Sequence, residues 1–154
     1  MPSVEVIADM AISVLLVDDE EAFLQTLAKR LTMRRFNVYT ASRRERVFRA
    51  LEENLIDVVV LDVKMPDLDG IEATQEIKTE YPLLEVILLT GHASMEASLD
   101  GLKLGAFDYL LKPVNIDELV YKIEDAFRKK ELQEEKIRRL ETRAEAATEE
   151  GTSD

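Results

Sequence analysis

The stretch Val58-Val-Val-Leu-Asp62 is an apolar run of strand length that ends in a carboxylate. Three more runs of this kind occur in the chain, and a polar residue follows each of them. Val14-Leu-Leu-Val17 is followed by Asp18-Asp19, Val86-Ile-Leu-Leu89 by Thr90, and Tyr109-Leu-Leu111 by Lys112-Pro113. The strands of a parallel sheet end at one edge, and open α/β sheets bind their ligands there. We therefore expect carboxylates, a hydroxyl group and an ammonium group to share one pocket.

Amphipathic segments of helix length alternate with the apolar runs, a pattern typical of βαβ units and a parallel sheet. The runs within residues 57–61 and 85–89 are apolar without alternation, as expected for strands that are covered on both faces. We expect strands at residues 13–17, 37–40, 57–61, 85–89 and 108–110. We expect helices at residues 20–35, 43–54, 69–80 and 94–104, and a last helix from residue 117 onward. The predicted fold class is α/β, with a doubly wound five-stranded parallel sheet.

The composition excludes several classes of protein. A length of 154 residues and a hydrophobic fraction of 46% fit one globular domain. The chain has no cysteine, which excludes disulfides and thiolate metal sites, and its net charge of −12 argues against direct nucleic-acid binding. No apolar run approaches the ~20 residues of a membrane span, and the first ten residues lack the basic start of a signal peptide. We therefore expect a cytoplasmic protein without membrane contact.

The last predicted helix continues beyond the end of the expected domain, without Gly or Pro until Gly151. A heptad register can be drawn through it, and Lys129 to Glu134 and Lys136 to Glu141 would be the charge pairs of a parallel coiled coil. Its a positions are Ile116, Ile123, Lys130, Ile137 and Ala144, and its d positions are Leu119, Ala126, Gln133, Leu140 and Ala147. Since a lysine and a glutamine interrupt this seam, a single solvated helix is the alternative.

The predicted organisation has three parts. An N-terminal extension covers residues 1–11, one domain covers residues 12–128, and a C-terminal helical extension covers residues 129–154. We expect the end of this extension to fray from Glu149 onward.

The polar residues at the strand ends suit phosphoryl chemistry. The carboxylates of Asp18, Asp19 and Asp62 would repel one another, and a bound cation would offset that repulsion. Oxygen ligands with open positions favour Mg²⁺, which recruits phosphate oxygens. With Lys112 alongside, a phosphoryl group attacked by Asp62 would have its charge neutralised on two sides, and aspartyl phosphate formation is a known form of carboxylate catalysis. Thr90 can donate a hydrogen bond to a phosphoryl oxygen.

At this point the chain resembles a family, the receiver domains of two-component response regulators of the chemotaxis type. The resemblance extends over roughly residues 13–128. It is carried by Val-Asp18-Asp19, by Leu-Asp62-Val-Lys-Met-Pro66-Asp-Leu-Asp-Gly70, by Leu-Leu-Thr90-Gly, and by Gly105-Ala-Phe-Asp-Tyr109-Leu-Leu-Lys112-Pro113. It implies the flavodoxin-like strand order 2-1-3-4-5.

The resemblance also implies a role for each matching residue. Asp62 would accept the phosphoryl group, and Lys112 would pair with that group. Asp19 would bind Mg²⁺ directly, Asp18 largely through water, and Lys64 through its backbone carbonyl, and Asp62 would also belong to the metal site. On phosphorylation, Thr90 would move to the phosphoryl oxygen and Tyr109 would turn inward behind it. This movement would remodel the face made by the fourth helix, the fifth strand and the fifth helix. The Lys112-Pro113 bond is expected to be cis.

The expected function is a phosphorylation-dependent signalling switch, with no enzymatic activity beyond its own phosphorylation and dephosphorylation. Its partners would be a sensor histidine kinase or phosphotransfer protein, an unknown downstream protein, and a second copy of the chain. About one long helix remains after Arg128, so we expect a stand-alone receiver. The alternative is a receiver-containing fragment of a transcription regulator whose DNA-binding or ATPase output domain is absent.

Overall fold

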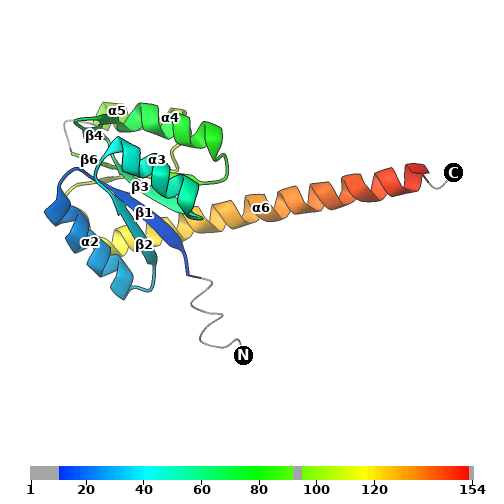
Figure 1. Cartoon of the computed structure of the whole chain (residues 1–154), viewed down its shortest axis with the longest axis horizontal. Coiled ribbons are helices and arrows are strands. Elements are labelled where there is room, and N and C mark those ends of the chain that lie inside the picture. The colour runs from blue at the N-terminus through cyan, green and yellow to red at the C-terminus, as the bar shows by residue number, and fades with distance from the viewer. Residues whose placement is uncertain (1–10, 92–94, 153–154) are drawn as a thin grey trace.

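The computed structural model describes residues 11–91 and 95–152. Five parallel strands form one sheet in the order β2-β1-β3-β6-β7 (Figure 1). The strands are β1 (Ser13–Val17), β2 (Asn37–Ala41), β3 (Val58–Asp62), β6 (Glu85–Thr90) and β7 (Asp108–Leu111). The helices are α2 (Glu21–Met33), α3 (Arg44–Glu53), α4 (Gly70–Glu80), α5 (Met95–Lys103) and α6 (Ile116–Thr152). The predicted fold class and strand order are confirmed.

The core has two layers because alternate residues of each strand face opposite sides of the sheet. On one side, α2 and α6 pack on the sheet through apolar residues such as Leu27, Leu31 and Ile123. On the other side, α3 and α4 pack on it through residues such as Leu51 and Ile77. Every residue of β3 and of β6 is buried, as predicted for strands covered on both faces.

Two features differ from the sequence prediction. A short antiparallel hairpin, β4 (Lys64–Met65) and β5 (Leu68–Asp69), lies in a stretch that composition describes only as a loop. The helix α6 continues to Thr152, although fraying is expected from Glu149. Residues 1–10 of the predicted N-terminal extension, Ser94 of the predicted fourth helix and the last two residues lie outside the described residues.

The start of α6 is determined by a local capping signal. The side-chain oxygen of Asn115 accepts a hydrogen bond from the N–H of Glu118 at 3.1 Å, which satisfies a donor that the helix itself leaves free. The first part of α6 covers the sheet with Leu119, Ile123 and Ala126, which are fully buried. From residue 131 to residue 149 the side chains are exposed, except for the half-buried Glu134. The second half of this 37-residue helix therefore projects from the domain (Figure 1).

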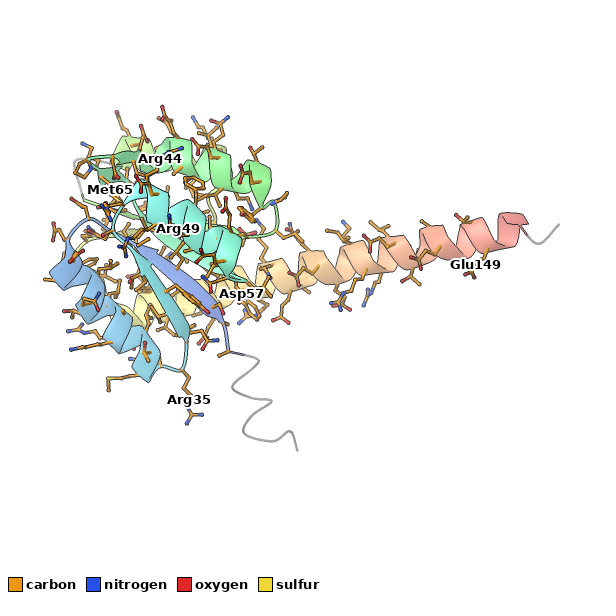
Figure 2. The ribbon with its side chains drawn as sticks, in the orientation of Figure 1. Arg35, Arg44, Arg49, Asp57, Met65 and Glu149 are labelled. Atoms are coloured by element: carbon orange, nitrogen blue, oxygen red, sulfur yellow. The ribbon has the colours of Figure 1, made fainter. Side chains whose placement is uncertain are left out.

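Two adjacent lysines tie α6 to the amino ends of the strands. Lys130 donates to Asp57 Oδ1 at 3.0 Å, and Asp57 Oδ2 accepts from the N–H of Ser13 at 2.9 Å. Lys129 Nζ lies 3.6 Å from Glu85 Oε2 and 5.8 Å from the centroid of the Phe107 ring. Figure 2 shows Asp57 where α6 leaves the domain. These contacts set the direction in which the helix projects.

Glu85 is a fully buried carboxylate at the start of β6. Neither of its oxygens has a hydrogen-bond partner among the described residues, and its charge is balanced by Lys129 and by Lys78, whose Nζ lies 3.7 Å from Oε1. Lys78 also donates to the carbonyl oxygens of Pro82 and Leu84. Burial lowers the pKa of Lys78, and the nearby Glu85 carboxylate offsets this effect only in part. The stability of the domain should depend on this pairing.

We predict that Lys78→Met lowers the free energy of unfolding by about 3 kcal/mol, because it leaves Glu85 buried with less compensating charge. The double variant Lys78→Met/Glu85→Leu should recover most of the loss, because no buried charge then remains. Urea unfolding measures both. Lys122→Met removes the more exposed pair with Asp108 and is the matched control, with an expected cost under about 1 kcal/mol. A double variant no more stable than Lys78→Met would contradict this account.

Candidate functional site

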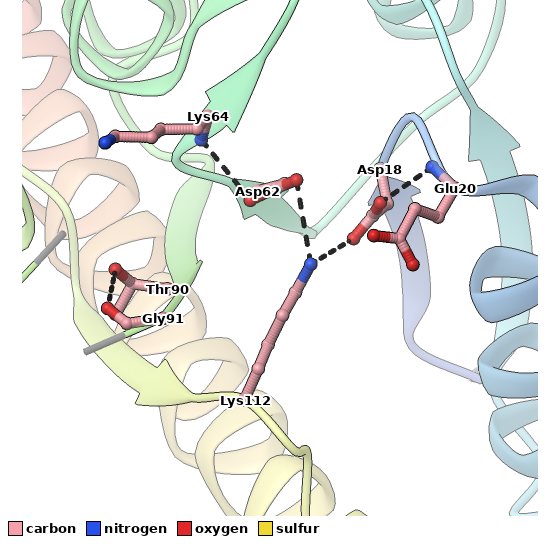
Figure 3. Close-up of polar contacts among 7 residues, drawn as sticks. All are labelled: Asp18, Glu20, Asp62, Lys64, Thr90, Gly91 and Lys112. Carbon is pink, nitrogen blue, oxygen red and sulfur yellow. Dashed lines mark hydrogen bonds and ion pairs between the residues drawn. The ribbon is translucent and has the colours of Figure 1, made fainter. Parts of the chain in front are cut away.

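The predicted site residues meet at the carboxyl edge of the sheet. Asp18 and Asp19 follow β1, Asp62 is the last residue of β3, and Lys112 follows β7. One carboxylate oxygen of each of the three aspartates lies within 4.8 Å of the others. The expectation that the three carboxylates and an ammonium group lie close together is confirmed, and Figure 3 shows Asp18, Asp62 and Lys112. The hydroxyl group expected with them, that of Thr90, is bonded elsewhere.

Lys112 bridges two of the carboxylates. Its Nζ donates to Asp18 Oδ2 at 2.7 Å and lies 3.6 Å from Asp62 Oδ2. Its backbone N–H donates to the Thr90 carbonyl at 2.8 Å, and its Nζ lies 4.8 Å from the centroid of the Phe23 ring. The Lys112–Pro113 peptide bond is cis, as predicted. Phe23 is a neighbour of the site that sequence reasoning missed, since an aromatic residue on α2 is more simply explained as core.

The charges of the site shift two pKa values. Burial raises the pKa of Asp62, the Lys112 charge lowers it, and the charges of Asp18 and Asp19 raise it again, so that it stays above its ordinary value. Burial alone would lower the pKa of Lys112, but its hydrogen bond to Asp18 and the nearby carboxylate charges raise it above its ordinary value. The ammonium group therefore stays charged, while Asp62 is an unusually basic carboxylate.

The three aspartates differ in their exposure to solvent. Asp18 is 1% exposed, and its Oδ1 accepts a hydrogen bond from the N–H of Glu20 at 2.9 Å. Asp62 is 8% exposed, whereas Asp19 is an exposed residue. The cluster is therefore shielded from solvent at Asp18 and Asp62 and open to solvent at Asp19. Such a set of oxygen ligands fits a hard divalent cation that keeps some of its water ligands.

The hairpin that follows Asp62 is packed tightly against the end of β3. The N–H of Lys64 donates to Asp62 Oδ1 at 3.3 Å, and the Lys64 side chain points away from Lys112 (Figure 3). A Cβ atom at Gly70 would come within 2.7 Å of the Val63 backbone and 2.8 Å of the Asp62 carbonyl oxygen. Only glycine allows this approach without movement of the backbone, so Gly70 lets the hairpin pack closely against the strand end that carries Asp62.

A pocket of about 740 Å³ opens beside this hairpin and is lined by Asp19, residues 63–69, Ile71 and Ala97. It reaches the open side of the aspartate cluster through Asp19 and Lys64. A small phosphorylated molecule could therefore approach the cluster from the side of the hairpin.

Thr90 and Tyr109 lie near the site without joining the charged cluster. The hydroxyl of Thr90, which is 1% exposed, donates to the carbonyl of its neighbour Gly91 at 3.0 Å (Figure 3). Tyr109 is half-buried and packs against the core on the α3–α4 side of the sheet. The movement of these two side chains on phosphorylation stays a prediction.

We predict that Asp62→Asn raises the melting temperature at pH 7 by a few degrees. A raised carboxyl pKa means that the folded protein binds this proton more tightly than the unfolded chain, so the charged form costs folding free energy. This cost is fully present above the folded pKa and is lost as the pH falls below the ordinary carboxyl value of 3.8. Calorimetry at several pH values measures the difference, with Asp100→Asn on α5 as an exposed control. A destabilised Asp62→Asn at pH 7 would refute this interpretation.

Comparison with known proteins agrees with this geometry. The family of response regulator receiver domains matches residues 14–124. A response regulator of NtrX-like type from Rickettsia felis is 34% identical over 128 residues, which are 82% of this chain and 27% of that protein. The regulatory protein AtoC of Escherichia coli K12 is 32% identical over 127 residues, with the same coverage of 82% and 27%. The chain thus spans about a quarter of the length of these relatives.

Solved structures show the same similarity. A receiver domain protein from Clostridium thermocellum superposes with a TM-score of 0.76 at 39% identity, covering 79% of this chain and 98% of that chain. NtrX from Brucella abortus superposes with a TM-score of 0.77 at 30% identity, covering 82% of this chain and 29% of that chain. Among the described residues, no helix combines the length and the hydropathy needed to cross a membrane. The chain belongs to the family of response regulator receiver domains.

Proposed function

We propose that the chain is a phosphorylation-dependent switch that accepts a phosphoryl group on Asp62. The observation that carries the proposal is the convergence of Asp18, Asp19, Asp62 and Lys112 at one edge of the sheet. As a receiver domain it would take this group from a sensor histidine kinase or a phosphotransfer protein. A carboxylate oxygen of Asp62 forms the new bond to phosphorus, while the bond from phosphorus to the donor imidazole nitrogen breaks and the imidazole leaves.

Lys112 would supply one part of the electrostatic stabilisation. Its ammonium group lies 3.6 Å from Asp62 Oδ2, within reach of an oxygen on a group attached there. The raised pKa of Lys112 keeps this group cationic, and its hydrogen bond to Asp18 holds it in place. A fixed positive charge at the position where negative charge develops lowers the barrier without reorganisation.

Mg²⁺ would supply the second part, since a bound divalent cation withdraws charge from the oxygens of the transferred group. Asp19 and Asp62 would bind the ion directly, Asp18 largely through water, and Lys64 through its backbone carbonyl. The exposure of Asp19 supports this assignment, because the ion needs an open side for water and for phosphoryl oxygens. Removing the ion should therefore stop the reaction.

The proposed output is a change in the face formed by α5, β7 and α6. Thr90 ends β6 and Tyr109 lies in the neighbouring strand β7, so both are well placed to pass a change at Asp62 to this face. The Thr90 hydroxyl would exchange its bond to the Gly91 carbonyl for one to the phosphoryl group. Phosphorylation would thus favour the state in which this bond forms, which is a shift of population between two conformations.

The relatives leave two forms of output open. A stand-alone receiver would act by contact with a downstream protein. The alternative is a receiver from a longer transcription regulator, because the chain matches only about a quarter of regulators such as AtoC. In both cases Asp62 would be the input site.

The central prediction is that incubation with Mg²⁺ and acetyl phosphate adds one phosphoryl group to the wild-type protein. Asp62→Asn should abolish the addition, because the attacking oxygen is gone, and EDTA should prevent it in the wild type. Intact mass spectrometry measures the product. The control Asp100→Asn has the same change of charge on α5 and should be labelled like the wild type. Stoichiometric labelling of Asp62→Asn would refute the assignment of the phosphoacceptor.

We further propose that α6 contributes to self-association. The a and d residues Leu119, Ile123 and Ala126 are buried against the sheet of their own chain, and Lys130 is held by Asp57. The seam free for a second copy therefore begins near Gln133. Ile137 and Leu140, which are 40% and 53% exposed, are its largest apolar side chains. The exposure of this seam supports a parallel pair of helices beyond the domain.

We predict that the full chain is dimeric and that deletion of residues 133–154 makes it monomeric, as measured by light scattering with and without acetyl phosphate. Ile137→Glu/Leu140→Glu should have the same effect, because it places charge in the seam. Leu132→Glu is the matched control, since Leu132 is 62% exposed but lies outside the a and d positions. An unchanged mass for the double variant would favour the single solvated helix.

A further inference from the structure

One segment of this acidic chain has a large excess of basic over acidic residues. Residues 29–49 contain eight Lys or Arg and one acid, Glu45, in a chain with 20 basic and 32 acidic residues. The segment comprises the end of α2, all of β2 and the first part of α3. Because β2 is the outermost strand and α2 and α3 pack on opposite faces of the sheet, this charge lies along one edge of the molecule. We call it the β2 edge surface.

Most of these cations have no acidic partner. Arg34 pairs with Asp117 at 2.7 Å, and Arg44 pairs with Glu76 at 2.8 Å. The other six are exposed and form no ion pair with any described residue, namely Lys29, Arg30, Arg35, Arg43, Arg46 and Arg49. Figure 2 shows Arg35 pointing away from the domain and Arg49 on α3. A chain with an excess of acids thus leaves a set of arginines free for an external anionic group.

The backbone of β2 offers a second feature of recognition. The N–H of Asn37 donates to Ile12, and the carbonyl of Ala41 accepts from Asp18, so both residues face β1. In a parallel ladder the bonding direction alternates, so the N–H and C=O groups of Val38 and Thr40 face the open edge. An open edge of this kind can pair with another extended segment. Tyr39, 36% exposed, and Met33, 84% exposed, add apolar surface beside it.

We propose that the β2 edge surface binds an acidic, extended protein segment that adds as a strand beside β2. The segment would pair with Val38 and Thr40 through its backbone. Its carboxylates would contact Arg35, which lies just before β2, and Arg43, which lies just after it. The five residues of β2 span roughly 16 Å, so a peptide of about seven residues with acids at both ends would reach both arginines.

The chemistry favours an acidic protein segment over a nucleic acid. Seven of the eight cations are arginines, whose planar guanidinium groups bind carboxylates with two parallel hydrogen bonds. A duplex would bring a long row of phosphates near the rest of the chain, which holds 12 basic and 31 acidic residues and would repel it. A short peptide avoids this repulsion. The β2 edge surface lies at the opposite edge of the sheet from β7, so this inference does not depend on the proposed output face.

The test is a titration of the full, isotope-labelled protein with the capped peptide Glu-Glu-Val-Thr-Val-Glu-Glu, followed by amide chemical shifts. We expect saturable shifts confined to α2, β2 and α3, and weaker binding as salt is raised. Arg35→Gln/Arg43→Gln should weaken binding about threefold to tenfold. Arg138→Gln/Arg143→Gln is the matched control, because it removes the same charge from the exposed part of α6 and should leave binding unchanged.

A second variant separates strand addition from simple charge attraction. Thr40→Pro removes an N–H that faces the open edge, where proline is tolerated, and should also weaken binding. Circular dichroism checks that this variant is folded before its binding is measured. Four results would each overturn the proposal: no saturable shifts at the β2 edge, equal losses for the two arginine double variants, undiminished binding by folded Thr40→Pro, or tighter binding of a 20-base-pair duplex than of the peptide. In the first case the arginines would only shield the edge strand against aggregation.

Discussion

The bridge that Lys112 forms between Asp18 and Asp62 is the interaction on which the site depends. Carboxylates this close repel one another, and two of them are almost fully withdrawn from water. The Lys112 ammonium group lies 2.7 Å from Asp18 Oδ2 and 3.6 Å from Asp62 Oδ2. It reduces the repulsion between the carboxylates, but one positive charge does not neutralise three negative ones. The remaining negative charge, which contributes to the raised pKa of Asp62, is what a bound cation would offset. The electrostatic repulsion among the three carboxylates is thus the basis of the proposed cation binding and reactivity.

At the amino ends of the strands, pairs of lysine and carboxylate side chains serve a structural purpose instead. Glu85 and Asp57 at the amino ends of β6 and β3 are paired with Lys129 and Lys130 of α6. At the carboxyl edge one lysine faces three carboxylates, so negative charge remains to bind a cation. At the amino edge two lysines, Lys78 and Lys129, lie beside the single buried carboxylate of Glu85. The projecting half of α6 is therefore held in a defined direction by a domain whose proposed input lies at the other end of the strands. A partner or a second copy would meet the helix in this orientation.

The two lateral edges of the sheet differ as well. At one edge, β7 lies between α5 and α6 and carries the proposed switch residue Tyr109. At the other, β2 is open and is bordered by unpaired arginines. A small domain can present separate surfaces for input, output and a further partner because a parallel sheet places each on a different side. The net charge of −12 conceals this division, since it averages a basic edge with acidic surfaces.

The five strands of the parallel sheet and the convergence of Asp18, Asp19, Asp62 and Lys112 could be predicted from the sequence, and the strand order from the resemblance. These follow from local apolar runs and from the rule that parallel strands end at one edge. The tertiary structure alone decided the rest. The contact of Phe23 with Lys112, the pairing of Glu85 with Lys78 and Lys129, and the close approach of Gly70 to Val63 join residues from different elements. The hydrophobic pattern of the sequence does not predict such contacts, because they depend on how helices and loops pack against the sheet.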